Sequence, residues 1–469
     1  MEKAQIGLIG LGVMGKNLVL NLEEKGYRVS VFNRTQEKTR QFKDQNSQKR
    51  LNATFTLEEF VESLQTPRKI ILMLKAGAPI DDAINLLIPL LESGDLIMDG
   101  GNSNYMHTKK RLELLKKHDI NYLGVGISGG EEGARNGPAL MPGGGEDAYK
   151  MVEQMLIDIS AKAYGEPCCA YLGNDGAGHF VKTVHNGIEY ADMQLIAEAY
   201  TILKKVIGFS DFEIHQTFKG WRKSELESYL IDITAEIFKE KDNKTDDYLI
   251  NKILDVAGQK GTGKWSSEIA LDIGVSTPTI TEAVFFRYMS NAKQEREFAS
   301  KVLKSPSFEA TYDKSMINVL KRALYAAKIC AYAQGFSLML KASKNFGWGI
   351  NLADVAKVFR GGCIIRAKFL NNIKDAFEKK PCLENILLDD YFLKVLDEYQ
   401  NDLRKIICAC INQGVTIPGF SSAISYFDAY RTNDLPTNLI QAQRDYFGSH
   451  TYQRVDEEGF FHTKWGEAQ

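Results

Sequence analysis

The pattern of apolar residues changes once along this 469-residue chain, and that change limits the folds it can adopt. Up to about residue 175, short apolar runs alternate with helical patterns, which predicts a mostly parallel, doubly wound α/β sheet. Beyond residue 176, helical periodicities continue to about residue 430, which predicts a large all-α region. The expected strands are Ile6–Ile9, Val29–Phe32, Ile70–Leu74, Leu96–Met98 and Tyr122–Ile127.

The helical region contains an internal repeat. The segment AEAYTILKK at 197–205 matches AQGFSLMLK at 333–341, an offset of 136 positions, and 218–220 matches 359–361, an offset of 141. Two related helical units are therefore expected between residues 177 and 435. The remaining segment, 436–469, is too short for a core but rich in aromatic residues, so we expect a tail that docks on another surface.

Bulk composition excludes several classes of protein. Lys and Arg total 58 against 60 Asp and Glu, so no basic excess indicates a nucleic-acid partner. No stretch approaches the roughly 20 apolar residues of a membrane span. Because the N-terminus runs straight into the first expected strand, we expect no signal peptide. Seven cysteines, an odd number, suit small buried thiols in a reducing cytoplasm. The scattered histidines predict no metal site.

A glycine-rich turn directly follows the first strand. Gly10, Gly12 and Gly15 form G-x-G-x-x-G before a helical pattern, the arrangement of a Rossmann-type dinucleotide site. The glycines allow a tight turn and a close approach to the pyrophosphate, which then faces a helix N-terminus. The other residues of this predicted loop are Leu11, Val13 and Met14.

The end of the second strand favours NADP over NAD. A cofactor without a 2′-phosphate is usually held here by an Asp or Glu on the ribose, and this chain has Asn33, Arg34 and Thr35 instead. The two polar side chains can hydrogen-bond a phosphate, and Arg34 can pair with it. The alternative is that Arg34 only begins the next helix.

Later strands also end in polar or glycine-rich turns, where ligands of open α/β sheets bind. Asn102 and Ser128 stand in two of these turns and can meet both nicotinamide and substrate. As single residues among glycines, they can equally be turn formers. The neighbouring candidates are Leu74, Lys75, Ala76, Gly129 and Gly130.

One polar stripe stands inside an otherwise apolar helical pattern. Its members, at i, i+3, i+4, i+7 and i+8, are Lys182, His185, Asn186, Glu189 and Tyr190. Lys182 and Glu189 are two turns apart, about 10 Å along a helix, which leaves room for a small hydroxylated acid. The repeat lacks the stripe at an offset of 136, which favours chemistry over the alternative of a buried polar patch between helices.

Residues 258–264, GQKGTGK, nearly spell a triphosphate-binding loop. Trp265 replaces the magnesium-binding hydroxyl, and the preceding 250–258 segment is predicted to be helical rather than a strand. The glycines, with Lys260, Thr262 and Lys264, still suit a smaller anion such as a sugar phosphate. Arg287 and Arg444 are charges on apolar segments that need partners, and structural ion pairs are the alternative. Cys363 is interpreted as packing.

Together these residues resemble the 6-phosphogluconate dehydrogenase family from end to end. Two departures are Gly12, where many members have Ala, and Asn136, where an aromatic residue is common. The motifs that carry the resemblance are GLGVMG, NRT, DGGNS, ISGGEEGAR, GAGHFVKTVHNGIEY, GQKGTGKW, RGGCIIR and LIQAQRDYFGSHTY.

The resemblance implies an NADP-dependent, decarboxylating enzyme of the pentose phosphate pathway that makes ribulose 5-phosphate from 6-phosphogluconate. It implies that 1–176 binds NADP, that 177–435 binds substrate and dimerises, and that 436–469 docks on the partner subunit of a homodimer. Lys182 matches the general base and Glu189 the general acid. The implied substrate residues are Asn102, Ser128, Gly129, Gly130, His185, Asn186, Tyr190, Lys260 and Arg287, with Arg444 and His450 supplied to the other subunit.

Two other functions fit part of the sequence. A different β-hydroxyacid dehydrogenase would not need Lys260, Arg287 and Arg444 together. A non-catalytic NADP-binding sensor would need the glycine loop but neither Lys182 nor Glu189.

Overall fold

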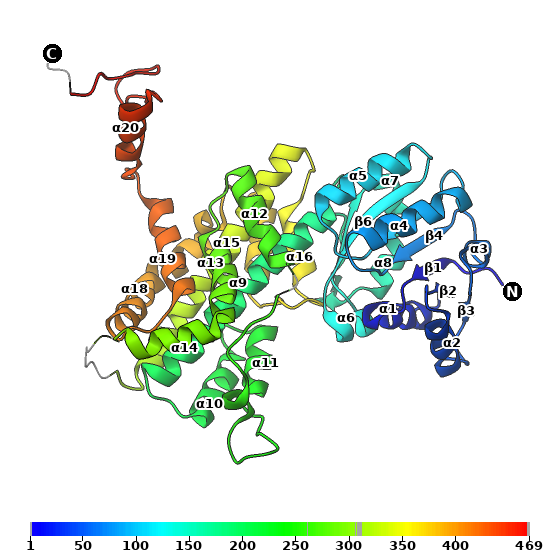
Figure 1. The fold of residues 1–469 in the computed structure, drawn as a ribbon, viewed down its shortest axis with the longest axis horizontal. Coiled ribbons are helices and arrows are strands. Elements are labelled where there is room, and N and C mark those ends of the chain that lie inside the picture. Colours follow the sequence, from blue (N-terminus) through cyan, green and yellow to red (C-terminus); the bar gives the residue numbers. More distant parts are fainter. Residues whose placement is uncertain (1, 260, 305, 307–311, 467–469) are drawn as a thin grey trace.

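A twisted sheet at one end of the molecule and a larger body of helices beside it form the structure (Figure 1). It is a computed structural model that describes residues 2–259, 261–304, 306 and 312–466. The sheet has the order β3-β2-β1-β4-β5-β6-β7, parallel except for β7, which runs antiparallel to β6. Its strands are β1 (Ile6–Ile9), β2 (Val29–Phe32), β3 (Leu51–Ala53), β4 (Lys69–Leu72), β5 (Leu96–Asp99), β6 (Asn121–Ile127) and β7 (Leu140–Gly144).

Helices cover both faces of this sheet, so the predicted doubly wound α/β fold is confirmed. One apolar layer joins the sheet to α1, α2 and α8, and the other joins it to α3, α4 and α5. A two-stranded sheet of β8 (Lys162–Ala163) and β9 (Glu166–Pro167) follows. The helices of this region are α1 (Val13–Glu24), α2 (Gln36–Gln45), α3 (Leu57–Glu62), α4 (Ala78–Leu87), α5 (Tyr105–Lys116), α6 (Gly130–Asn136), α7 (Glu146–Lys150) and α8 (Glu153–Ile159), with a 3-10 helix at Ile88–Leu90.

Helices make up nearly all regular structure from Ala177 onward in the described chain, as the sequence predicts. The core of this region is continuous and strongly apolar. Its helices are α9 (Ala177–Lys205), α10 (Asp211–Trp221), α11 (Tyr229–Ile237), α12 (Thr262–Ile273), α13 (Pro278–Asn291), α14 (Lys293–Val302), α15 (Met316–Phe346), α16 (Leu352–Phe359), α17 (Leu370–Lys379), α18 (Asp390–Asn412), α19 (Pro418–Arg431) and α20 (Thr437–Gly448), with 3-10 helices at Leu249–Lys252 and Ile386–Leu388.

Helix α9 joins the sheet to the helical body. Its first turn packs against β6 and β7 so closely that a Cβ on Gly178 would lie 2.3 Å from the Met141 carbonyl oxygen. Farther along, the same helix packs on α15, α12 and α13. A single 29-residue helix therefore belongs to both parts of the molecule.

The long helices of the two repeats, α9 and α15, pack against each other. Asp192 and Lys328, which are equivalent at the offset of 136, form an ion pair of 2.8 Å that is almost fully buried.

A second pair of equivalent residues, Glu198 and Gln334, makes contacts between the units, because each bonds the start of a helix in the other unit. Glu198 on α9 accepts the backbone N–H groups of Gly419 and Phe420 at the start of α19. Gln334 on α15 accepts the N–H of Thr279 at the start of α13. Each unit therefore satisfies the N-terminus of a helix in the other.

The C-terminal segment projects away from the helical body and carries α20 (Figure 1). No helix in the described residues is long and apolar enough to cross a membrane. All seven cysteines are free; five are buried, and Cys382 and Cys408 are exposed, so the expectation of buried thiols holds for only part of the set.

Candidate active site

The polar stripe lies on one helix, as predicted. Lys182 is buried, and its Nζ donates to the Ser128 hydroxyl at 3.0 Å and lies 3.2 Å from Nδ1 of His185. Ser128 follows β6, so the turn after the strand meets the stripe directly. Burial lowers the pKa of Lys182 below its ordinary value, and the nearby charge of Glu189 offsets part of this effect.

His185 lies between the two candidate catalytic groups. Its Nδ1 is 3.8 Å from a carboxylate oxygen of Glu189 and 3.2 Å from the Asn186 side-chain oxygen. Burial raises the pKa of Glu189, against the opposing charges of Lys182 and Arg287. Burial, then the charge of Lys182, holds the pKa of His185 well below its usual range. Low-polarity surroundings thus favour a neutral amine, a neutral imidazole and a protonated acid on one face.

Two glycines make room for this face. A Cβ on Gly126 would lie 2.6 Å from the Cβ of Lys182, and a Cβ on Gly263 would lie 2.5 Å from the ring of Tyr190. The guanidinium of Arg287 stacks on the other side of the site, 3.7 Å from the centre of the Tyr190 ring, and donates to the Gly258 carbonyl. Gly263 therefore serves packing, whereas a Cβ on Gly258 or Gly261 would meet nothing within 4 Å.

The RGGCIIR segment closes the site from the second repeat. A Cβ on Gly129 would lie 2.5 Å from the Gly362 carbonyl oxygen, which also accepts the Ala139 N–H. Cys363 is buried, and its thiol donates to the Phe359 carbonyl oxygen. Burial raises the pKa of Cys363 to about 12, although Lys182 opposes the shift. A thiol in this state packs rather than attacks, which agrees with the interpretation from sequence.

Asn102 stands beside the stripe, in a left-handed conformation with φ of 52°. Its side-chain amide exchanges two hydrogen bonds with the backbone of Ile127, 3.1 Å and 3.0 Å long. These bonds tie the turn after β5 to the residue before Ser128. The turn-forming role of Asn102 is therefore confirmed, and its contact with nicotinamide or substrate stays a prediction.

The glycine loop has the conformation that a dinucleotide needs. Gly10 has φ of 108°, and a Cβ on Gly15 would lie 1.9 Å from the Gly10 carbonyl oxygen. A Cβ on Gly12 would meet nothing within 4 Å, so space is open in front of the α1 N-terminus. Asn33 holds the loop by accepting the Leu11 N–H.

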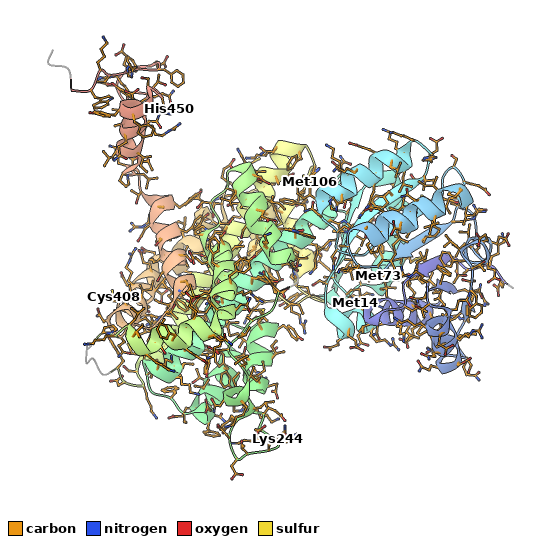
Figure 2. All side chains as sticks on the ribbon, viewed as in Figure 1. Met14, Met73, Met106, Lys244, Cys408 and His450 are labelled. Atoms are coloured by element: carbon orange, nitrogen blue, oxygen red, sulfur yellow. The ribbon has the colours of Figure 1, made fainter. Side chains whose placement is uncertain are left out.

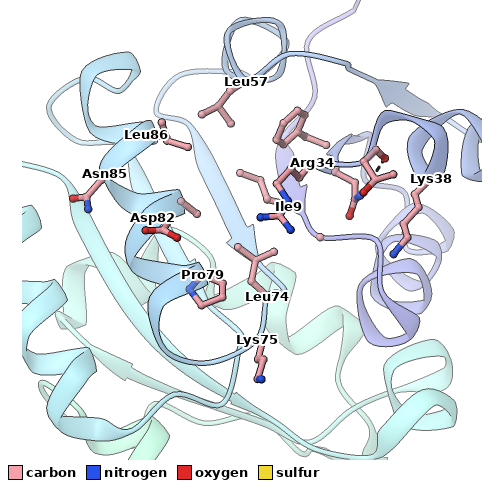
Figure 3. A pocket seen from close by; sticks show the side chains of 15 residues that line it. Ile9, Arg34, Lys38, Leu57, Leu74, Lys75, Pro79, Asp82, Asn85 and Leu86 are labelled. Carbon is pink, nitrogen blue, oxygen red and sulfur yellow. Dashed lines mark hydrogen bonds between the residues drawn. The ribbon is translucent and has the colours of Figure 1, made fainter.

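A cavity of about 830 Å³ lies beside this loop, between the ends of β1, β2 and β4 and helix α4 (Figure 3). Its lining includes Arg34, Thr35, Lys38 and Lys75, so three cations surround a space large enough for a nucleotide. Such a lining fits a nucleotide with an additional phosphate. Sequence reasoning missed Lys38; its position four residues after Arg34, at the start of the next helix, was the available signal.

Two predicted residues, Arg444 and His450, lie away from the site of their own chain. Arg444 and His450 are exposed on the projecting tail, and Figure 2 shows His450 far from the sheet. Lys260 lies outside the described residues.

The helix predicted for residues 250–258 is wrong, because regular structure there is limited to the 3-10 turn at Leu249–Lys252. Asp255 pairs with Lys293 and Arg296 instead, and these tertiary contacts override helix propensity.

A dinucleotide loop at the edge of a parallel sheet, next to a buried amine and acid, defines a pyridine-nucleotide-dependent dehydrogenase. Residues 5–173 match the NAD binding domain of 6-phosphogluconate dehydrogenase, and residues 178–465 match the C-terminal domain of 6-phosphogluconate dehydrogenase. The chain belongs to the 6-phosphogluconate dehydrogenase family.

Relatives match along the whole chain. The NADP(+)-dependent, decarboxylating 6-phosphogluconate dehydrogenase of Bacillus subtilis (strain 168) is 53% identical over 99% of this chain and 100% of its own length. The decarboxylating 6-phosphogluconate dehydrogenase of Staphylococcus aureus (strain N315) is 54% identical over 99% of both chains. The solved structure of Plasmodium falciparum 6-phosphogluconate dehydrogenase superposes with a TM-score of 0.96 at 42% identity, over 98% of this chain and 100% of that one.

Proposed function

We propose that this protein oxidises and decarboxylates 6-phospho-D-gluconate to D-ribulose 5-phosphate and carbon dioxide while NADP is reduced. The observation that carries the proposal is the buried Lys182 and the partly buried Glu189 on one face of α9, with opposite pKa shifts. The names of the relatives and the Plasmodium falciparum complexes with NADP+ and 6-phosphogluconate support the same reaction. The rival readings, a different hydroxyacid dehydrogenase or a sensor, have no comparable support.

Lys182 is the proposed general base. Its lowered pKa makes the neutral amine available, and the Ser128 hydroxyl fixes the direction of the Nζ group. The amine accepts the proton of the substrate 3-hydroxyl as hydride leaves carbon 3. Bound NADP supplies the hydride acceptor. The ammonium then returns this proton to the oxygen at carbon 3 while carbon 1 departs as carbon dioxide, and the electrons of the broken bond form the C2–C3 double bond of an enediol.

Glu189 is the proposed general acid. Its raised pKa favours the protonated carboxyl, which delivers a proton to carbon 1 of the enediol. Carbon 1 of the product is the former carbon 2 of the substrate. Lys182, neutral again, takes the proton of the hydroxyl on the former carbon 3, whose oxygen becomes the ketone of ribulose 5-phosphate. His185 lies between the two groups, and because it is neutral it adds no positive charge beside Lys182.

The remaining residues are grouped by the part of the substrate or cofactor that we propose they bind. The stacked pair of Arg287 and Tyr190, with the start of α12, suits the phosphate end of the sugar. Ser128, Gly129, Gly130, Asn102, His185 and Asn186 border the carboxylate and hydroxyl end, and Lys260 is a further proposed phosphate ligand. The proposed NADP residues are Gly10, Leu11, Gly12, Val13, Met14, Gly15, Asn33, Arg34, Thr35, Leu74, Lys75, Ala76 and Asn102.

A product assay tests the reaction. With 6-phosphogluconate and NADP, the purified protein should form one reduced nicotinamide and one carbon dioxide per turnover. Gluconate without the phosphate should react far more slowly, because the cationic contacts are lost. Equal rates for both acids would instead support a different hydroxyacid dehydrogenase, and nucleotide binding without turnover would support a sensor.

A homodimer is part of the proposal, with Arg444 and His450 of each tail completing the site of the other subunit. The tail projects from its own chain and exposes large apolar side chains, including Tyr446 and Phe447 at 68% and 73%. The surface of α13 beside Arg287 also exposes Phe285 and Met289. Two apolar surfaces on one chain that do not cover each other suit a second copy of that chain.

Mixed dimers test this exchange. Lys182→Ala and Arg444→Ala chains, co-expressed with different affinity tags and purified through both, should form dimers with one intact site. Activity well above that of either variant alone is expected if the tail crosses. Activity no higher than that of Arg444→Ala would show that the tail serves its own subunit.

We also propose the domain division 1–176, 177–435 and 436–469, which is supported by the start of α9 and by the projecting tail. The cytoplasm is the proposed compartment, supported by seven unpaired thiols.

A further inference from the structure

One carboxylate in the tail is buried although almost everything around it is exposed. Asp445 has 0% of its surface exposed, whereas its neighbours Tyr446 and Phe447 are among the most exposed aromatic residues described. The tail itself covers Asp445, since the segment after α20 folds back over the helix. A short segment without a core of its own therefore encloses a charged group.

Four donors converge on the two oxygens of this carboxylate. The N–H of Thr451 and Nδ1 of His462 lie 3.0 Å and 2.9 Å from Oδ1. The N–H of Thr463 and the indole N–H of Trp465 lie 3.0 Å and 2.8 Å from Oδ2. Burial alone raises the pKa of Asp445, but the bonds from Thr463, His462 and Trp465 outweigh it and lower the pKa to about 2.

These bonds fix the turn that carries His450. Ser449 and Thr451, on either side of it, have left-handed φ angles of 50° and 59°, which non-glycine residues adopt only when their surroundings hold them. Asp445 holds the Thr451 N–H, and Gln441 holds the Thr451 carbonyl oxygen. The direction of the His450 side chain follows from that turn.

The same carboxylate anchors the far end of the tail. Tyr452 and Phe461 exchange two backbone hydrogen bonds of 2.8 Å, which close a hairpin that leads to His462, Thr463 and Trp465. Arg444 immediately precedes Asp445 on α20. One side chain therefore links the helix that carries Arg444, the turn that carries His450, and the hairpin beyond them.

We propose that Asp445 is a positioning residue, whose carboxylate holds the tail in one preformed shape that carries Arg444 and His450 together into the partner's substrate site. This inference rests on the proposed exchange of tails between subunits. It adds that the tail is organised before it meets the partner. The recognition surface is a rigid unit rather than a flexible strand, so association does not bear the entropy of ordering it.

Asp445→Asn tests the proposal with little change of volume. The amide presents an NH2 group where two donors already point, so about half of the bonds are lost. We expect KM for 6-phosphogluconate to rise at least about tenfold, or about 1.4 kcal/mol of binding, with a smaller change in kcat. Hydrogen exchange at the Thr451 and Thr463 amides should accelerate while the helical core stays protected. Asp456→Asn is the matched control, because its carboxylate bonds the exposed Arg454 side chain of the same tail; its KM should stay within about twofold.

Mixed dimers separate this proposal from the one on which it rests. Asp445→Asn paired with Lys182→Ala should recover one site with the unaltered KM, because the intact tail then serves the intact Lys182. If mixed dimers with Lys182→Ala recover activity when the other chain is Arg444→Ala but not when it is Asp445→Asn, the exchange of tails stands and the positioning role of Asp445 is overturned. An unaltered KM or unaltered amide exchange in Asp445→Asn dimers would overturn it as well. No recovery in either pairing would overturn the exchange of tails itself.

Discussion

Helices α9 and α15 occupy equivalent places in the two repeats, yet only α9 carries the proposed chemistry. On α15 the positions that match His185, Asn186 and Glu189 hold Lys321, Arg322 and Tyr325. Each of these has a partner outside the helix, respectively Glu225 at 3.3 Å, Asp402 at 2.5 Å and the Tyr391 hydroxyl at 2.9 Å.

On α9 the polar groups contact one another instead. Lys182, His185 and Glu189 are linked in series. Among the residues that the structure describes, the 3.8 Å contact between His185 and Glu189 is their one contact at ion-pair distance. The comparison shows that polarity at a helix face is common to both repeats. Reactivity needs polar groups that are removed from water and left unpaired in their charged forms, because only then do their pKa values move.

The largest expected effect sharpens this contrast directly. Lys182→Ala and Glu189→Ala should each reduce kcat at least about a hundredfold, the low end for a positioned base or acid. Lys321→Ala, at the equivalent of His185 on α15, should leave kcat within about twofold. Steady-state rates of purified dimers with matched melting temperatures make the comparison. A comparable loss at Lys321 would mean that the two helix faces do not differ in function.

The ion pair between the helices should dominate stability. Lys328→Met leaves the buried Asp192 carboxylate without its partner and should lower the free energy of unfolding by about 3–5 kcal/mol. Adding Asp192→Asn to the same chain should restore most of that loss, since the charge is then gone. Denaturant unfolding of the two single variants and the double variant measures the coupling. Additive losses would show that the pair is not coupled.

The pH dependence of kcat/KM distinguishes the amine of Lys182 from the carboxyl of Glu189, two turns apart on α9. Lys182 must be neutral, so activity should rise with pH through a value below its ordinary 10.5. Glu189 must be protonated, so activity should fall with pH above a value higher than its ordinary 4.5. The two limbs belong to the coupled pair rather than to either residue. In Glu189→Gln the falling limb should disappear from the residual rate; its persistence would assign that limb to another group.

The smallest expected effect concerns Glu198, which caps the start of a helix in the other repeat. Burial raises the pKa of Glu198 to about 7, against hydrogen bonds from Gln194, Phe420 and Gly419. A carboxyl with a raised pKa contributes stability that is complete below its unfolded value and is lost as pH rises toward 7. Glu198→Gln, which makes the α9 cap resemble Gln334, should remove that decline, a difference of about 1–3 kcal/mol between pH 5 and pH 8. Melting curves across this range provide the check, and parallel curves would contradict the titration of Glu198.

The sequence anticipated the strands that carry apolar runs, and β1 and β2 have the predicted bounds. It missed β3, which has three residues with a central Asn52, and β7, which contains Pro142 and two glycines. Those glycines are needed because a Cβ on Gly143 would lie 2.2 Å from the Gly178 N atom. Residues that normally punctuate turns here make a close contact between a strand and α9.

The stripe itself was predictable because its spacing is local. Contacts between distant segments were not. The pairing of Asp192 with Lys328 joins positions 136 apart, and the four bonds to Asp445 depend on a chain reversal that no periodicity announces. The bonds of Asn102 to Ile127 likewise depend on neighbouring strands meeting at one edge.

The close contact at Gly178 has a mechanical consequence. Because α9 starts packed against β6 and β7 and continues without interruption past Glu189, one helix fixed to the sheet carries the proposed base and acid. A rotation of the helical body relative to the sheet would therefore keep the contact between Lys182 and Ser128. Any side chain at Gly178 would collide with the Met141 carbonyl oxygen and so shift α9, with both proposed catalytic groups, relative to the sheet.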